Sequence, residues 1–283
     1  VGCKNCERHC PTDAIKVTPG VMPGYVPPCG TACPAGTDVQ GYIALAGAGR
    51  YEDAYRLIRQ SNPFPSVCGR ICNHPCQAAC NRNDLDESVG IRDIKRFVAD
   101  KAFENGMPVV EKKRKSNGKK IAVIGAGPSG LSCAYYLQLS GYSVEVFESE
   151  SVAGGVLAYG IPEYRLPKAV LNRDIQAIEA TGVQIHLNTE VVDITFSSTP
   201  DRKVATEVQT ICEGADKTFH LTDDDLLFIT SGSCVANSSF GSQDEPAQFN
   251  AVLEKGTGFD LWRRIARQAS AFGHPEKFIG APD

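Results

Sequence analysis

The sequence of 283 residues lacks any run of about eighteen consecutive apolar residues, the length that a membrane-spanning helix requires. Its first residues also lack the basic and then apolar pattern of a secretory signal peptide. Hydrophobic residues make up 42% of the chain and charged residues 22%, which is a globular composition. We therefore expect a cytoplasmic protein without a membrane span.

Strong positive charge is absent as well. The formal net charge of -4 argues against a nucleic-acid-binding protein. The basic run from Lys112 to Lys115 lies beside a Pro-containing stretch, and we interpret it as a solvated linker. The five histidines are scattered, so no Ser-His-Asp or Cys-His nucleophile is predicted.

Cysteine, in contrast, is abundant and concentrated at one end. Nine of the twelve cysteines fall within the first 80 residues. In a secreted chain this clustering would indicate disulfides, but the C-x-x-C and C-x-x-x-C-P spacings favour metal ligation by thiolates. An iron-sulfur cluster is the favoured metal group, with zinc or unmetallated thiols as alternatives. The scattered Cys133, Cys212 and Cys234 are interpreted as ordinary buried thiols.

The stretch "PSVCGRICNHPCQAAC" places Cys68, Cys72, Cys76 and Cys80 at intervals of four. In one continuous helix the outer two would stand about 18 Å apart, which is further than one cluster reaches. Pro75 also disfavours such a helix. The segment must therefore turn, or its thiols must be divided between sites that include Cys29 and Cys33. We expect the neighbouring His74 to be a turn residue rather than a ligand.

The stretch "CKNCERHCPTDA" contains Cys3, Cys6 and Cys10 in the order of a bacterial ferredoxin run without its first cysteine. We interpret residues 1–20 as a ferredoxin-like remnant. Its three thiols are candidate metal ligands that lack the second run of a two-cluster ferredoxin.

Apolar spacing predicts the remaining organisation. Residues 39–60 and 89–103 have helical periodicity, which predicts a helical metal-binding domain over residues 21–110. Residues 119–150 read as strand, Gly-rich turn, helix and strand. Short strands over residues 183–230, the first of them at residues 183–196, predict a β-meander that closes with the apolar strand "LLFITSGS". We expect an α/β protein with an N-terminal α-helical domain and a Rossmann-like domain over residues 118–240.

The Gly-rich turn carries a dinucleotide-binding pattern. Gly125 permits a tight turn, Gly127 lets the backbone approach a pyrophosphate at the helix N-terminus, and Gly130 allows close packing. Glu148 ends the next strand 23 residues after Gly125, where it would accept hydrogen bonds from ribose hydroxyls. The other predicted loop residues are Ala126, Pro128 and Ser129. The glycines alone do not choose between FAD and NAD.

Residues 29–190 resemble the N-terminal half of the glutamate synthase small subunit and its relatives, including the N-terminal part of dihydropyrimidine dehydrogenase. The matching stretches include "CGTACPAGTDVQGYI", "NPFPSVCGRICNHPCQAAC", "IAVIGAGPSGLSCAYYLQLSGYSVEVFE" and "GGVLAYGIPEYRLPK". The resemblance implies 4Fe-4S clusters in the helical domain beside an FAD-binding domain. It also implies electron flow from NADPH through FAD to the clusters, with an electron-donating or electron-accepting partner.

The same resemblance implies a set of site residues. Gly155 and Leu157 would contact the flavin and Arg165 would lie near its phosphates. Val191 and Ile71 would line the cofactor, although core packing is the alternative for Ile71. The implied iron ligands are Cys33, Cys72, Cys76 and Cys80, followed by Cys29 and then Cys68.

Residues 183–283 resemble a different flavoprotein family, oleate hydratase, through "GVQIHLNTEVVDI", "HLTDDDLLFITSGSCVANSSFGSQDEPA" and "LWRRIARQASAFGHPEKF". That family binds FAD and adds water to a fatty-acid double bond. Its catalytic acid residues have no counterpart here, so no catalytic residue is assigned. The chain therefore resembles a chimera that joins near residues 182–191, with residues 241–283 as an oleate-hydratase-like tail.

Three functions follow from these patterns. The expected one is an electron-transfer oxidoreductase module that holds FAD and at least one 4Fe-4S cluster. The alternatives are a hydratase and a non-catalytic, metal-stabilised fragment. Because no second G-x-G-x-x-G stretch follows for NADPH, we expect this chain to bind FAD but not to reduce a dye rapidly with NADPH.

Overall fold

The structure is a computed structural model that describes residues 27–106, 113–198, 202–230, 242–247 and 258–277. Cys3, Cys6 and Cys10, and with them the predicted ferredoxin-like remnant, lie outside these residues, as does Cys234. Within the described residues, no helix combines the length and the apolar character needed to cross a membrane.

The first described unit consists of short helices, as predicted. Its core combines Tyr42, Tyr55, Ile58 and Val98, all with no exposed surface. The predicted helical stretch over residues 39–60 breaks at Gly49, whose φ of +75° is a left-handed conformation that glycine adopts freely. The helices are α2 (Pro28–Thr31), α3 (Val39–Gly47), α4 (Tyr51–Arg59), α5 (Pro65–Ile71), α6 (Pro75–Ala78), the 3-10 helix η1 (Asn81–Asp84) and α7 (Ile91–Glu104).

The cysteine segment turns between α5 and α6, as predicted. Cys72 ends α5 in an extended conformation, and His74 follows with a left-handed φ of +47°. Pro75 is the first residue of α6, where its missing N–H removes no helical hydrogen bond. His74 is therefore the predicted turn residue, and its Nδ1 lies 3.2 Å from the Cys72 carbonyl oxygen.

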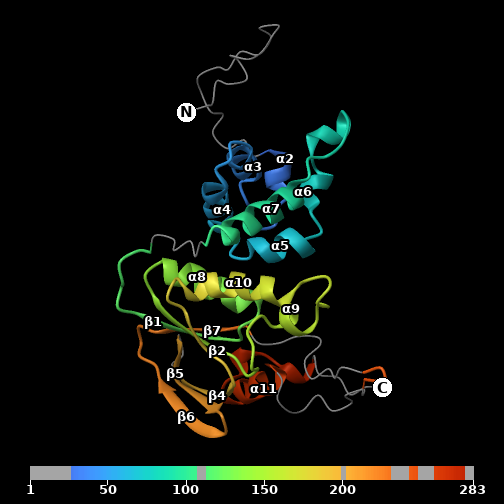
Figure 1. The fold of residues 1–283 in the computed structure, drawn as a ribbon. Helices are drawn as coiled ribbons and strands as arrows, with labels where there is room; N and C mark the ends of the chain where they lie inside the picture. The colour runs from blue at the N-terminus through green and yellow to red at the C-terminus, as the bar shows by residue number, and fades with distance from the viewer. Residues whose placement is uncertain (1–26, 107–112, 199–201, 231–241, 248–257, 278–283) are drawn as a thin grey trace.

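The second unit contains a parallel sheet with the strand order β3-β2-β1-β7. Figure 1 shows α8, α9 and α10 lying between this sheet and the first unit. The helices and the sheet bury a shared cluster that includes Val123, Leu131, Tyr135 and Val146. This arrangement confirms the Rossmann-like α/β prediction. The elements are β1 (Lys120–Ile124), α8 (Pro128–Leu139), β2 (Ser143–Phe147), α9 (Val156–Tyr159), α10 (Lys168–Glu179), β3 (Gln184–His186) and β7 (Leu226–Ile229).

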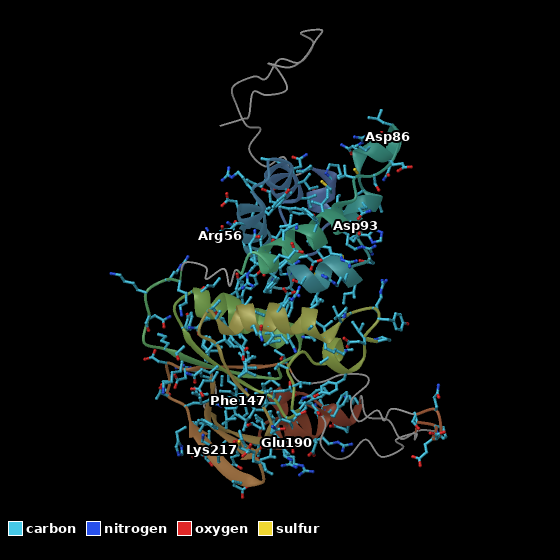
Figure 2. The ribbon with its side chains drawn as sticks, in the orientation of Figure 1. Arg56, Asp86, Asp93, Phe147, Glu190 and Lys217 are labelled. Carbon is cyan, nitrogen blue, oxygen red and sulfur yellow. The ribbon has the colours of Figure 1, made fainter. Side chains whose placement is uncertain are left out.

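An antiparallel meander and one helix lie on the other face of the sheet (Figure 1). The meander consists of β4 (Thr189–Ser198), β5 (Lys203–Cys212) and β6 (Ala215–His220), and the helix is α11 (Gly258–Gln268). Phe147 lies between β2 and the meander (Figure 2), where its ring centroid is 4.9 Å from that of Phe219. The tail helix thus belongs to the α/β unit, since Leu261 and Ile265 join the same cluster as Phe147.

One predicted strand is wrong in extent. Residues 183–196 were expected to form one strand, but they divide into β3 of the parallel sheet and β4 of the meander. The division occurs at Asn188, whose φ of +49° lies in the left-handed region that asparagine tolerates. Its amide donates to the Glu150 carbonyl oxygen at 3.0 Å, which holds the turn against the end of β2.

The helical unit and the α/β unit share a buried interface. Arg59 at the end of α4 has no exposed surface, and its Nη2 donates to the Ala177 carbonyl oxygen on α10 at 3.1 Å. Its guanidinium carbon lies 4.8 Å from the ring centroid of Tyr135 on α8, and the Tyr135 hydroxyl donates to the Arg59 carbonyl oxygen. Phe64 and Val67 enter the α/β cluster directly. Helix α5 of the helical unit therefore contributes to the core of the α/β unit, while the helical unit keeps its own cluster around Tyr42.

Asp174 connects α10 to α5 within this interface. The side chain is completely buried, and Oδ2 accepts a hydrogen bond of 3.0 Å from the Val67 amide. Burial raises the pKa of Asp174 to about 7, while the Val67 amide and the Ser66 side chain oppose the increase. Neither Ser66 Oγ nor Asp174 Oδ1 makes a hydrogen bond of standard geometry, so the desolvation prevails.

Replacing Arg59 tests the interface. Arg59→Ala removes the bond to Ala177 and the contact with Tyr135, so we expect the free energy of unfolding to fall by about 3 kcal/mol. Arg56→Ala is the matched control, because Arg56 lies on the same helix in a half-exposed pair with Glu52 (Figure 2), and its effect should stay below about 0.5 kcal/mol. Equal losses in urea-induced unfolding would contradict a specific role of Arg59.

Replacing Asp174 tests the buried carboxyl group. Because its pKa is raised from 3.8 to about 7 on folding, the folded state binds the proton more tightly. The free energy of unfolding should therefore fall as the pH rises from about 4 to about 7 and then level off. Asp174→Asn should reduce this fall when urea unfolding is compared across the same pH range. An unchanged slope in the variant would contradict the assignment.

Candidate functional site

The Gly-rich loop joins β1 to α8. Gly125 has a φ of +96°, and Gly127 is the N-cap residue of α8. A Cβ atom on Gly130 would lie 1.9 Å from the Gly125 carbonyl oxygen, so packing alone requires glycine there. A Cβ atom on Gly127 would meet nothing within 4 Å, which leaves open space before the helix N-terminus. Ala126 is buried, Pro128 is half-buried, and Ser129 is exposed.

Glu148 lies against this loop as predicted. The residue is 8% exposed, and Oε2 accepts a hydrogen bond of 2.7 Å from the Ala126 amide. Oε1 accepts another of 3.1 Å from the Glu150 amide. A carboxylate at the end of β2 beside unpaired amides of a helix N-terminus is the arrangement that binds a nucleotide, with ribose at the carboxylate and phosphates at the helix.

The loop before α9 lies against the Gly-rich loop. The Gly154 amide donates to the Ala126 carbonyl oxygen at 2.8 Å. Gly155 has a φ of +51°, and a Cβ atom there would lie 3.0 Å from the Gly127 Cα atom. The structure therefore brings Gly155 together with the predicted dinucleotide loop.

The other predicted flavin residues lie in varied surroundings. Leu157 is 7% exposed and belongs to the core between the helices and the sheet. Val191 is also buried, but it belongs to the cluster on the meander face. Ile71 is half-buried against the α/β core, and Arg165 is exposed.

The candidate iron ligands in the described residues are free thiols, of which Cys76 is buried and the others are half-buried. Two of them pack beside one side chain, Tyr42 on α3: Cys76 belongs to the same buried cluster, and Cys29 packs against that cluster. Tyr42 has no exposed surface, and its hydroxyl donates to the Ile91 carbonyl oxygen at 3.0 Å. Burial raises the pKa of Tyr42 far above its ordinary value, and negative charge on Cys76, Cys33, Cys29 and Cys72 would raise it further. Cys76 and Cys29 therefore lie at the core of the helical unit.

The pKa of the Cys33 thiol is lowered. Burial, the largest single effect, would raise it, but hydrogen bonds with the Thr37 side chain and with the backbone of Thr37 and Ala35 lower it, and the charge of Lys95 adds to that decrease. Donors of this kind stabilise a thiolate and, in iron-sulfur proteins, influence the potential of the cluster.

Cys76 and Cys68 have raised pKa values, in contrast to Cys33. Burial raises the pKa of Cys76, against the opposing charge of Lys95. Burial also raises the pKa of Cys68, whose Sγ donates to Asn62 Oδ1 at 3.7 Å and which packs against the α/β core. Cys80 lines a pocket of about 350 Å³ together with Cys29.

A structural zinc ion needs four donors within about 2.3 Å of one point, whereas a 4Fe-4S cluster binds its thiolates at different iron atoms. Across the part of the chain that the structure describes, no three His, Cys, Asp or Glu side chains are gathered closely enough to hold one metal ion. The C-x-x-x-C-P spacing is what favours a cluster over zinc.

Three family models match the chain. Residues 22–107 match one described as dihydropyrimidine dehydrogenase domain II, 4Fe-4S cluster. Residues 123–187 match an NAD(P)-binding Rossmann-like domain, and residues 175–283 match the MCRA family, which is oleate-hydratase-like. The last two matches overlap at residues 175–187, close to the predicted join.

Three relatives each match between 59% and 67% of this chain. A protein named NADP(+)-dependent formate dehydrogenase subunit beta, from Moorella thermoacetica, is 45% identical over 62% of this chain and 28% of its own length. The NADPH-Fe(3+) oxidoreductase subunit beta of Geobacter sulfurreducens is 43% identical over 59% of this chain and 25% of its own length. The glutamate synthase (NADPH) small chain of Bacillus subtilis is 37% identical over 67% of this chain and 41% of its own length.

These matches confirm the predicted resemblances on both sides of the join. They also confirm the α/β fold with an N-terminal iron-sulfur domain, and they support an oxidoreductase by resemblance. The cofactor class is confirmed as an iron-sulfur cluster and a nucleotide of the flavin or nicotinamide type. The chain spans less than half the length of each of these relatives.

Two glycine variants test the geometry of the loop. Gly130→Ala forces a Cβ atom against the Gly125 carbonyl oxygen, so we expect the free energy of unfolding to fall by about 3 kcal/mol or more. Gly127→Ala adds the same methyl group in open space at a φ of -74° and should change it by less than about 1 kcal/mol. Urea unfolding of both variants provides the measurement, and similar losses would show that the loop packs differently.

Proposed function

We propose that this chain is an electron-transfer oxidoreductase module that binds FAD in its α/β unit and at least one 4Fe-4S cluster in its helical unit. The observation that carries the proposal is the packing of the free thiols Cys76 and Cys29 with buried Tyr42, in a unit whose helix α5 enters the core of a dinucleotide-binding fold. The relatives named as NADPH-dependent oxidoreductase and glutamate synthase subunits support the same class.

Cys33, Cys72 and Cys76 are the proposed first ligands of the cluster. Their mutual electrostatic influence supports this choice, since the charges of Cys33 and Cys72 both raise the pKa of Cys76. Cys29 and Cys80 are the candidates for further ligands. Cys68 is the least suited, because its thiol already bonds Asn62 and packs against the α/β core.

The proposed flavin site uses the Gly-rich loop. Gly127 and the N-terminus of α8 would receive the pyrophosphate, and Glu148 would receive the ribose. Gly155 lies beside Gly127 and would continue the site toward the flavin ring. Leu157, Arg165 and Val191 remain proposed flavin residues by resemblance alone.

FAD accepts electrons in pairs and an iron-sulfur cluster accepts them singly, which is the chemistry that the two groups supply when bound. The contribution of this chain is their relative placement. Ile71 packs against the α/β core and is followed directly by the proposed ligand Cys72. The buried α5 contact also excludes water between the two units.

A partner protein or domain would complete the electron path. The relatives carry subunit names, and two of the names include NADPH. This sequence contains one G-x-G-x-x-G loop, which we assign to FAD. We therefore propose that NADPH oxidation takes place on another part of the complete system, in the cytoplasm.

A hydratase is the second candidate, and the MCRA match to residues 175–283 is the observation that favours it. Within the described residues, however, this segment forms strands and a helix that cover the sheet. That position supports a structural contribution to the flavin domain more than a separate reaction.

The test is cofactor analysis of anaerobically purified protein. We expect flavin absorbance together with about four irons and equivalent sulfide per cluster. Cys76→Ser should lose iron and retain flavin, whereas Cys133→Ser, which alters a half-buried thiol on α8, should retain both. Zinc in place of iron, or full iron in Cys76→Ser, would contradict the proposed cluster. Rapid NADPH-driven dye reduction by this chain alone would contradict the need for a partner.

A further inference from the structure

Lys95 on α7 is a buried cation without a carboxylate partner. Its residue surface is only 8% exposed. Throughout the described ranges, no Asp or Glu forms an ion pair with it, although other cations of the helical unit, such as Arg70 with Asp100, are paired. Lysine is rarely buried unless its charge is compensated, because desolvation of an isolated charge is costly. The compensation for Lys95 must therefore come from other groups.

Lys95 faces the ring of Tyr42, which lies in the same buried cluster as Cys76, with Cys29 packed against that cluster. Nζ lies 5.7 Å from the centroid of the Tyr42 ring. The charge of Lys95 lowers the pKa of Cys33 and opposes the rise at Cys76 and Cys68. A cation–π contact alone compensates a buried ammonium only weakly. A thiolate-bound cluster at Cys76 and its neighbouring cysteines would provide the negative charge that a buried ammonium group requires.

We propose that Lys95 balances the negative charge of a 4Fe-4S cluster held by Cys33, Cys72 and Cys76 and thereby raises the reduction potential of that cluster. This inference rests on the proposed function, since it requires the cluster to bind. Lys95 acts through its charge as a positioning and tuning residue and not as a ligand, because an ammonium group has no free electron pair for iron.

The direction of the effect follows from electrostatics. Reduction adds one electron to a thiolate-bound cluster and changes no ligand bond, so the negative charge of the site increases by one. A nearby cation stabilises the reduced form more than the oxidised form. The effect is stronger in surroundings of low polarity, and Lys95, Tyr42 and Cys76 are all buried.

The experiment is a redox titration of the anaerobic, iron-loaded full chain with dithionite, followed by electron paramagnetic resonance. Lys95→Gln should move the midpoint of the cluster to a more negative value, by a tenfold change in the equilibrium, which is about 59 mV for one electron. Lys95→Arg keeps the charge and should stay close to the wild-type value. Lys101→Gln is the matched control on the same helix, because Lys101 pairs with the exposed Glu104 at the surface.

Each outcome decides the inference. An unchanged midpoint in Lys95→Gln with full iron would overturn it. If Lys95→Gln loses iron while Lys95→Arg retains it, the charge is required for binding, and the inference stands. If both variants lose iron, the shape of the side chain matters and its charge does not, which overturns it. Absence of iron from the wild-type protein would instead defeat the proposed function itself.

Discussion

The contact of α4 and α5 with α10 is the constraint on which the rest of the molecule depends. It joins a unit of short helices to a parallel sheet through groups that are buried on both sides. Arg59 reaches the Ala177 carbonyl oxygen, and the Val67 amide reaches Asp174. Short helices bury little surface individually and gain stability chiefly from packing. The helical unit therefore takes its orientation from the α/β unit, and loosening this contact would alter both proposed cofactor sites together.

The contact also explains why the cysteine segment has its shape. Helix α5 must present Phe64 and Val67 to the α/β core, and it ends at Ile71. The chain then turns through the left-handed His74, so that Cys76 lies in the core of the helical unit while Cys68 packs against the α/β core. A packed helix and a turn therefore separate cysteines that are evenly spaced in the sequence.

The sequence was sufficient to predict features that are set by the backbone conformation of a short segment. The Gly-rich loop, the acidic end of β2 and the turn at Pro75 were all predictable, since each depends on a few adjacent residues. The split at Asn188 and the helix α10 were not predicted, because an asparagine within an apolar pattern does not specify where one sheet ends. Tyr42 and Lys95 were missed for a related reason. Both fit an ordinary helical pattern, and only the tertiary structure places them among the thiols.

The join between two family resemblances is physically sound in this fold. Strand β3 completes the parallel sheet at one edge, and β4 begins the meander three residues later, after the left-handed turn at Asn188. Residues beyond the join then return to the parallel sheet. Strand β7 pairs with β1, and Leu261 and Ile265 pack with Ala122 and Ile124 of β1. A segment that only followed the first by accident would leave the meander face of β1 uncovered. The two parts instead bury each other's apolar surface, so the α/β unit depends on both. Because the Gly-rich loop begins where β1 ends, the tail that packs on β1 also contributes to the stability of this loop.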